Sequence, residues 1–295
     1  MKKWLFILFV CVLGATFVLK DREEMAKTVD LNEDAKAIIL IEAETGKVLY
    51  KENSTESLPI ASMSKLMTQY LVLNAIESGS LTWESTYEPT DYVQQMVGQS
   101  GVVKLGMSPD KLYSVKELFT AMTVVSANDA AIALAEMVAG TEDAFVEIMN
   151  EQAKLFGMKA TTYFTASGLD GAYIGKGAGY ANVSSAKDVA VLAQELIAKH
   201  PAVLEFTKIT DFTTSDGARL WATNLMLSGM PQAMAGIDGL KTGYTDEADS
   251  CFVSTGVFDG KRYISVVIGV QADGSDTINP RFNLTRELFE RYVLD

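Results

Sequence analysis

The feature that most constrains the fold is the position of the β-strand signals, which lie on both sides of a helical block. The first two flank a turn that contains Gly46, and the last two flank a turn at residues 258–261, which is typical of β-hairpins. We expect both ends of the chain to share one antiparallel sheet of five strands, and therefore an α+β fold. In chain order the predicted strands are 37–42, 47–51, 239–243, 250–255 and 262–269.

The segment between these strands predicts a mostly helical lobe. Ser114, Thr141 and Ser185 each precede an apolar periodic stretch and are predicted N-caps. Residues 206–210 and 219–221 are predicted as further short strands, and the chain ends in an amphipathic helix. The predicted helices are 62–76, 114–125, 130–138, 141–157, 186–198 and 281–293.

The N-terminus has the pattern of an export signal. Two lysines precede the apolar run Trp4–Leu19, which ends at a charged segment. Secretion after cleavage and retention as an N-terminal membrane anchor are both compatible with this run, whose length is close to the lower limit of about 17 residues for a span. We therefore divide the chain into a signal or anchor with a linker (1–34) and one extracytoplasmic domain (35–295).

Composition excludes several classes of function. The net charge of −13 argues against a nucleic-acid-binding protein, which needs clustered Lys and Arg. With two cysteines and one histidine in the chain, neither a cysteine-type zinc site nor a histidine-rich metal centre can be built, so no metal or other cofactor is expected. A Ser-His-Asp triad would have to use His200, which is more simply interpreted as a residue at a helix end.

The first candidate for chemistry is the pair Ser62 and Lys65. Positions three apart in a helix lie on the same face, so the hydroxyl and the amine would be neighbours at a helix start that favours a developing oxyanion. A lysine held against apolar residues has a lowered pKa, as a proton acceptor requires. The same Ser-x-x-Lys spacing recurs at Ser108 and at Ser184, so this pair alone does not identify a site.

Two further tripeptides place polar groups where chemistry or ordinary structure could need them. Ser126-Ala127-Asn128 lies between two apolar helices, and helix capping would explain it equally well. Lys241-Thr242-Gly243 lies on a predicted strand, where a cation, a hydroxyl and a glycine suit a substrate carboxylate, although a solvated strand end would look the same.

Taken in order, the three motifs resemble the active-site set of the penicillin-recognising serine enzymes, which is Ser-x-x-Lys, Ser-x-Asn and Lys-Thr-Gly on a strand. Each of the two tripeptides occurs once in the chain. The flanking residues, such as Asp129 and Tyr244, are similar to those of the low-molecular-mass penicillin-binding proteins, specifically D-alanyl-D-alanine carboxypeptidases. The resemblance extends from about residue 35 to the C-terminus and implies their DD-peptidase fold.

This resemblance implies a role for each motif residue. Ser62 would attack the carbonyl between the terminal D-alanines of a peptidoglycan stem peptide, and Lys65 would accept its proton. Ser126 would relay a proton to the leaving amine beside the cationic Lys241. Asn128 would orient the substrate amide. The remaining expected contributions are backbone N–H groups of Ser62 and Tyr244 in an oxyanion hole, Thr242 and Gly243 at the substrate carboxylate, and Arg281 or Arg219 beside it.

The resemblance also implies a class of ligand and leaves two alternative functions open. β-Lactams are expected to acylate Ser62. A serine β-lactamase is the nearest alternative, for which Asp170 is the available carboxylate although the usual Glu-x-x-Leu-Asn pattern is missing. A non-catalytic wall-binding protein of the same fold is the other.

Three details of the chain depart from the family pattern. Relatives commonly carry a C-terminal β-rich domain, which we expect to be absent because the chain stops at Asp295. Asp249 stands where the family usually has glycine. Cys251 lies two residues further along the chain, and we interpret it as either a buried strand residue or a reactive thiol.

Overall fold

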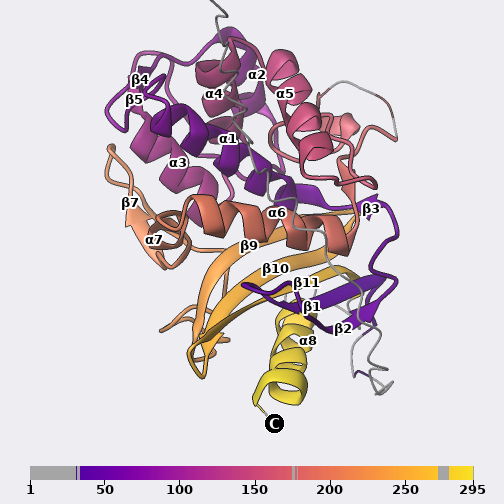
Figure 1. The fold of residues 1–295 in the computed structure, drawn as a ribbon. Helices are drawn as coiled ribbons and strands as arrows, with labels where there is room; N and C mark the ends of the chain where they lie inside the picture. The colour runs from indigo at the N-terminus through magenta and orange to yellow at the C-terminus, as the bar shows by residue number, and fades with distance from the viewer. Residues whose placement is uncertain (1–30, 32–33, 175–176, 178, 272–278, 295) are drawn as a thin grey trace, which may run out of the picture.

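The protein consists of one antiparallel sheet with helices on both faces (Figure 1). The computed structural model describes residues 31, 34–174, 177, 179–271 and 279–294. The predicted signal or anchor Trp4–Leu19 lies outside these residues. Among the helices that are described, none combines the length and hydrophobicity that crossing a membrane requires.

The five-stranded sheet has the order β2-β1-β11-β10-β9, which confirms that both ends of the chain share it. All neighbouring pairs are antiparallel, and β1 pairs with β11 in a register that places Ile39 opposite Val266. The tight turn between β10 and β11 uses Asp259 and Gly260, both with positive φ, as a hairpin turn requires. The strands are β1 (Ala37–Glu42), β2 (Val48–Glu52), β9 (Ile237–Thr245), β10 (Asp249–Phe258) and β11 (Lys261–Val270).

The sheet is buried on both faces, which explains why its central strands β1 and β11 carry the long apolar runs at residues 37–41 and 266–268. Ile39 and Val253 face the core beneath the helical lobe, whereas Ile38 and Phe252 face a second core beneath the C-terminal helix α8 (Asn279–Phe289). The predicted helix 281–293 corresponds to α8, which begins at Asn279 and ends at Phe289. A turn of π-helix, Glu290–Leu294, continues from its end.

The helical lobe surrounds α1, which is buried on almost every side, with ten of its 13 residues buried. The predicted caps are confirmed, because the side chains of Ser114, Thr141 and Ser185 each accept a hydrogen bond from a backbone N–H in the following turn. The lobe contains α1 (Lys65–Glu77), α2 (Asp91–Gly98), α3 (Val115–Val124), α4 (Asn128–Ala139), α5 (Glu142–Leu155), α6 (Ala186–Lys199) and α7 (Val203–Thr207).

Two local predictions were wrong. No strand forms at 206–210: Phe206 and Thr207 end the helix α7, and the strand β7 begins at Asp211. Phe206 packs against the rings of Trp83 and Phe119, at centroid distances of 5.1 and 4.9 Å. The predicted helix start at Ser62 is instead a 3-10 turn, η1 (Ala61–Ser64), before α1 begins at Lys65.

The remaining strands form short pairs around the lobe, and the strand predicted at 219–221 is confirmed in one of them. One more 3-10 turn, η2 (Gly171–Ile174), follows α5. The pairs are β3 (Leu58–Pro59) with β6 (Val183–Ser184), β4 (Thr86–Tyr87) with β5 (Tyr113–Ser114), and β7 (Asp211–Thr213) with β8 (Arg219–Trp221).

Candidate active site

Ser62 and Lys65 lie side by side where the turn η1 enters α1. The Lys65 Nζ atom is 2.9 Å from the Ser62 Oγ atom. Ser62 is half-buried and Lys65 is fully buried, so the hydroxyl is reachable from outside while the amine is not. The 3-10 turn therefore preserves the neighbourhood that helical spacing predicts.

Two carbonyl oxygens complete the surroundings of the Lys65 amine. It donates to the side-chain carbonyl of Asn128 at 2.8 Å and to the backbone carbonyl of Ser167 at 2.6 Å. A carbonyl only accepts, so a neutral amine must give its two N–H groups to these oxygens. Its lone pair is then left for the third neighbour, the Ser62 hydroxyl.

Electrostatics favours that neutral amine. Burial is the main cause that holds the pKa of Lys65 well below its ordinary value, and the nearby Lys241 lowers it further. Asp129 and Glu142 act in the opposite direction and raise this pKa. The net effect is a lowered pKa, which favours the neutral amine that can accept a proton.

The turn Ser126-Ala127-Asn128 connects α3 to α4 and brings Asn128 to Lys65. Neither polar side chain caps α4, whose N-cap is Ala127. Asn128 donates to the Val103 carbonyl through its side chain (2.8 Å) and its backbone (3.0 Å). Ser126 is buried with a φ of 69°, a conformation that a non-glycine residue rarely adopts and that is concentrated at functional sites.

Lys241 and Thr242 lie on β9, at the edge of the sheet. Lys241 is buried and donates to the Thr242 carbonyl at 2.9 Å. Burial, assisted by Arg281, lowers the pKa of Lys241 to about 7. Thr242 Oγ1 donates to Thr223 Oγ1 at 2.7 Å, so two hydroxyl groups lie together.

Gly243 brings this strand against the turn that carries Ser62. A Cβ atom at this position would lie 2.9 Å from the Ile60 carbonyl oxygen, a distance that real Cβ atoms essentially never show. The glycine of the third motif is therefore required by the close approach of the Ile60 backbone, a contact within the fold that the sequence analysis did not predict.

The three remaining candidates are Tyr244, Arg281 and Arg219, and each has its own surroundings. Tyr244 follows Gly243 and is half exposed. Arg281 is buried on α8 and donates to the backbone carbonyls of Gly243 (2.7 Å) and Cys251 (3.2 Å). The alternative Arg219 is paired with Asp211 across the β7–β8 hairpin at 2.7 Å.

The other two Ser-x-x-Lys pairs have ordinary structural partners. Ser184 Oγ lies 2.7 Å from Thr161 Oγ1, and the backbone N–H of Ser108 donates to the Tyr113 hydroxyl at 2.8 Å. The Lys111 ammonium lies over the Tyr113 ring. Of the three candidates, Ser62 with Lys65 is the pair that has the geometry of a nucleophile and its base.

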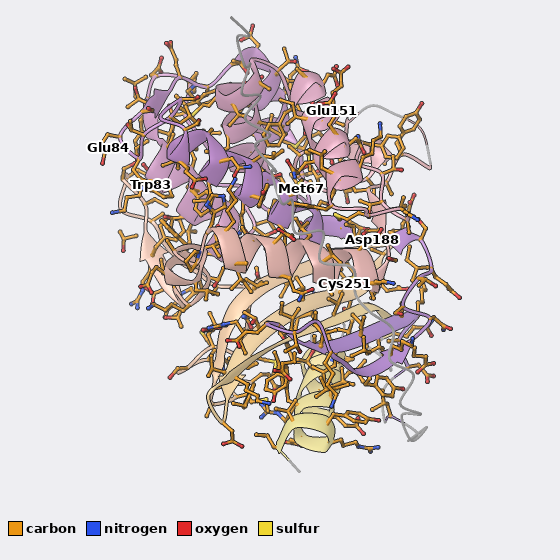
Figure 2. All side chains as sticks on the ribbon, viewed as in Figure 1. Met67, Trp83, Glu84, Glu151, Asp188 and Cys251 are labelled. Carbon is orange, nitrogen blue, oxygen red and sulfur yellow. The ribbon has the colours of Figure 1, made fainter. Side chains whose placement is uncertain are left out.

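The departures at Asp249 and Cys251 are structural. Cys251 is fully buried in the core between the sheet and the helical lobe (Figure 2), and burial raises the pKa of its thiol to about 11, the environment of a structural cysteine. These observations favour the buried strand residue over the reactive thiol. Asp249 has a φ of 54° and pairs with Lys36 at 2.8 Å.

Three contributors to the site were missed by sequence reasoning: the backbone carbonyls of Val103 and Ser167 and the hydroxyl of Thr223. The available signal was Gly168, next to Ser167, with a φ of 80°. A Cβ atom there would lie 2.1 Å from the Ala61 carbonyl oxygen. This glycine lets the loop pass directly against the turn η1.

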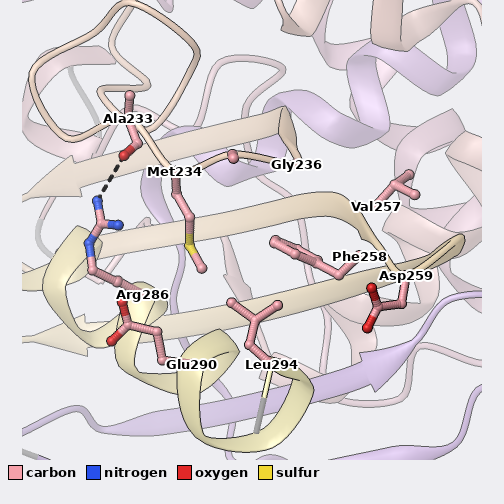
Figure 3. Close-up of a pocket in the computed structure, with 10 residues that line it drawn as sticks. Ala233, Met234, Gly236, Val257, Phe258, Asp259, Arg286, Glu290 and Leu294 are labelled. Carbon is pink, nitrogen blue, oxygen red and sulfur yellow. Dashed lines mark hydrogen bonds between the residues drawn. The ribbon is translucent and has the colours of Figure 1, made fainter.

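An open groove between α8 and the β10–β11 turn is separate from this site (Figure 3). Its floor is apolar, and none of its described lining residues belongs to the three motifs. They include Met234, Phe258, Arg286 and Leu294.

Comparison with known proteins supports one family. Residues 23–272 match the family model described as D-alanyl-D-alanine carboxypeptidase. The carboxypeptidase DacF of Bacillus subtilis is 33% identical over 277 residues, which cover 91% of this chain and 66% of DacF. DacC of Escherichia coli is 32% identical, covering 86% of this chain and 60% of DacC. The chain therefore spans less than two thirds of the length of these relatives.

Two solved structures have the same fold. A peptidoglycan synthesis regulatory factor (PBP3) of Streptococcus pneumoniae is 40% identical with a TM-score of 0.83, covering 88% of this chain and 71% of that one. Penicillin-binding protein D2 of Listeria monocytogenes in its cefotaxime-bound form is 38% identical with a TM-score of 0.76, covering 89% and 98%. With its three motifs gathered at one edge of the sheet, this chain belongs to the D-alanyl-D-alanine carboxypeptidase family of serine peptidases.

Proposed function

We propose that the protein is a serine-type D-alanyl-D-alanine carboxypeptidase that removes the terminal D-alanine from peptidoglycan stem pentapeptides. The single observation that carries this proposal is the arrangement around the Lys65 amine. Two carbonyls take its N–H groups, and the Ser62 hydroxyl lies at its third position, 2.9 Å away. Such a pair supplies both a nucleophile and the base that activates it.

In acylation, Ser62 Oγ attacks the carbonyl carbon of the bond between the two D-alanines, and its proton passes to Lys65. The C–N bond then breaks, and the leaving amine takes a proton by way of Ser126, with Lys241 keeping the local field positive. Free D-alanine departs and leaves an ester on Ser62. Water hydrolyses that ester, which restores the hydroxyl and releases the shortened peptide.

The remaining motif residues hold the substrate. Asn128 orients the substrate amide, and backbone N–H groups of Ser62 and Tyr244 stabilise the oxyanion. Thr242 and Gly243 contact the terminal carboxylate. Because the guanidinium of Arg281 donates to backbone carbonyls of β9 and β10, we assign it a positioning role beneath the strand rather than the direct contact first expected.

Partners and location follow from this activity. Penicillin-binding protein D2 of Listeria has structures with bound cefotaxime and ampicillin, and we propose that β-lactams acylate Ser62 here as well. The stem peptide places the protein outside the cytoplasm, in agreement with the export signal pattern at Trp4–Leu19. Retention in the membrane through that segment is part of the proposal.

The decisive experiment measures D-alanine release from a stem pentapeptide together with the lifetime of a fluorescent penicillin adduct. We expect release by the wild-type protein, a long-lived adduct, and loss of both in Ser62→Ala. Ser184→Ala is the matched control and should behave as wild type. Rapid turnover of the penicillin would favour the β-lactamase alternative, absence of labelling would favour a non-catalytic protein, and undiminished release by Ser62→Ala would exclude the mechanism.

A further inference from the structure

A buried carboxylate outside the three motifs lies close to the site. Glu142 is in the first turn of α5 and is 5% exposed. One oxygen accepts a hydrogen bond from the backbone N–H of Ala166 at 2.8 Å, and the other accepts one from the Tyr92 hydroxyl at 2.5 Å. A charge at this depth is costly unless it is well bonded, so its position calls for a function.

The backbone that Glu142 holds leads directly to Lys65. Ala166 is bonded on both sides, because its carbonyl accepts from the Thr68 hydroxyl at 2.7 Å. The next carbonyl, that of Ser167, accepts from Lys65 at 2.6 Å. Thr68 and Lys65 are both on α1, so the loop is attached to α1 by two carbonyls and to α5 by one carboxylate.

We propose that Glu142 is a positioning residue for Lys65, acting through the loop that carries the Ser167 carbonyl. The proposal rests on the assignment of Lys65 as the base of the proposed function. If this carbonyl shifts, one N–H of the neutral amine loses its acceptor and the lone pair is no longer directed at Ser62. Small displacements of this kind are sufficient to slow a reaction strongly.

The charge of Glu142 has a separate, measurable effect. The charged groups that act on Lys65 are Lys241 from β9, Asp129 from α4 and Glu142 from α5. On its other side Glu142 meets Tyr92 of α2, whose pKa is raised by burial and by this carboxylate. Glu142 raises the pKa of Lys65, so its neutralisation moves the pH at which the amine becomes a base to lower values.

Glu142→Gln and Glu142→Ala separate position from charge. Glutamine can accept a hydrogen bond from the Ala166 N–H and donate one to the Tyr92 hydroxyl oxygen, so it keeps both contacts without the charge. Alanine removes both hydrogen bonds and the charge. Glu147, exposed on the same helix, provides the control Glu147→Gln. For each protein the second-order rate of acylation by a fluorescent penicillin is measured against pH, and hydrogen exchange is followed in residues 164–169.

We expect Glu142→Ala to be acylated at least about tenfold more slowly at every pH, with faster exchange in the loop. Glu142→Gln should recover the rate and the protection, with its rate midpoint at lower pH than wild type, while Glu147→Gln matches wild type. Wild-type acylation in Glu142→Ala would overturn the positioning role, and an unshifted midpoint in Glu142→Gln would contradict the separate charge effect. If Glu142→Ala does not fold, the acylation rate and loop protection of Glu142→Gln decide, because a side chain that keeps both contacts must keep the rate and the protection. D-alanine release is measured separately, so an acylated wild type that releases none contradicts the proposed function alone.

Discussion

Replacement of Lys65 by methionine tests the centre of the proposed mechanism. Methionine has a similar length and no proton to exchange, and the position is fully buried, so the side chain fills the same space. The change removes the group that lies 2.9 Å from Ser62 Oγ and leaves the hydroxyl in place. Its proton must then pass to water when Ser62 attacks.

The expected magnitudes follow from these contacts. A positioned general base contributes about 10²–10⁴ in rate, equivalent to roughly 3–5 kcal/mol in the barrier to acylation. The carbonyl oxygens of Asn128 and Ser167 lose a donor, which costs about 1–3 kcal/mol each. Removal of a desolvated amine offsets part of this cost, so Lys65→Met should remain folded.

The assay is acylation by a fluorescent penicillin, measured against pH below the ordinary pKa of a lysine, which is the direction in which burial moves the pKa of Lys65. Wild-type acylation should rise with pH as the Lys65 ammonium loses its proton, because the ammonium donates all three bonds and has no lone pair. Lys65→Met should be acylated about 10²–10⁴ times more slowly, and its acylation rate should no longer rise with pH. Lys187→Met, from another Ser-x-x-Lys pair, is the control. A folded Lys65→Met protein with acylation within about threefold of wild type would refute the assignment of Lys65 as the base.

Three further substitutions test the third motif. Lys241→Met should move the acylation midpoint to higher pH, because Lys241 lowers the pKa of Lys65. In urea titrations the stability of the wild type should rise between pH 7 and roughly 10.4, because there the unfolded lysine binds a proton that the folded one, with a pKa of about 7, has released. Lys241→Met should lack this rise. Thr242→Val should lower kcat/KM for the pentapeptide about 10–100-fold, with Thr242→Ser close to wild type. Gly243→Ala should lower the stability by about 1–3 kcal/mol and slow acylation, because its Cβ atom meets the Ile60 carbonyl; Gly98→Ala, with open space around it, is the comparison, and an equal effect of both would contradict the close approach.

The sheet was predictable because its signals are local. Apolar runs of strand length, separated by turns with Gly46 or Gly260, determine the strands, and burial on both faces then brings the two ends of the chain together. The segment around Phe206 was not predictable from its own residues. Its conformation depends on Trp83 and Phe119, which are distant in the sequence and pack on the Phe206 ring.

The same distinction applies to the site. Ser62, Asn128 and Lys241 belong to motifs, so side-chain identity and order reveal them. The carbonyls of Val103 and Ser167 have no such signature, because every residue type has the same carbonyl group. What makes the Ser167 carbonyl an acceptor for Lys65 is the path of a loop held by distant groups, and a path of this kind is visible only in the folded chain.

The packing that stabilises the lobe is also what makes the chemistry possible. Lys65 is on α1, in which ten of 13 residues are buried, and Lys241 is buried on β9; burial is the largest cause of the lowered pKa of each. A folded state that desolvates two lysines is less stable than one with apolar residues at these positions. The carboxylates of Asp129 and Glu142 reduce that cost, but they also raise the pKa of Lys65. Closer or more numerous carboxylates would keep the amine protonated at neutral pH, and a protonated amine cannot accept the proton of Ser62. The two carboxylates therefore offset only part of the desolvation cost of the lysines. The fold is less stable as a result, and the Lys65 amine stays neutral next to Ser62.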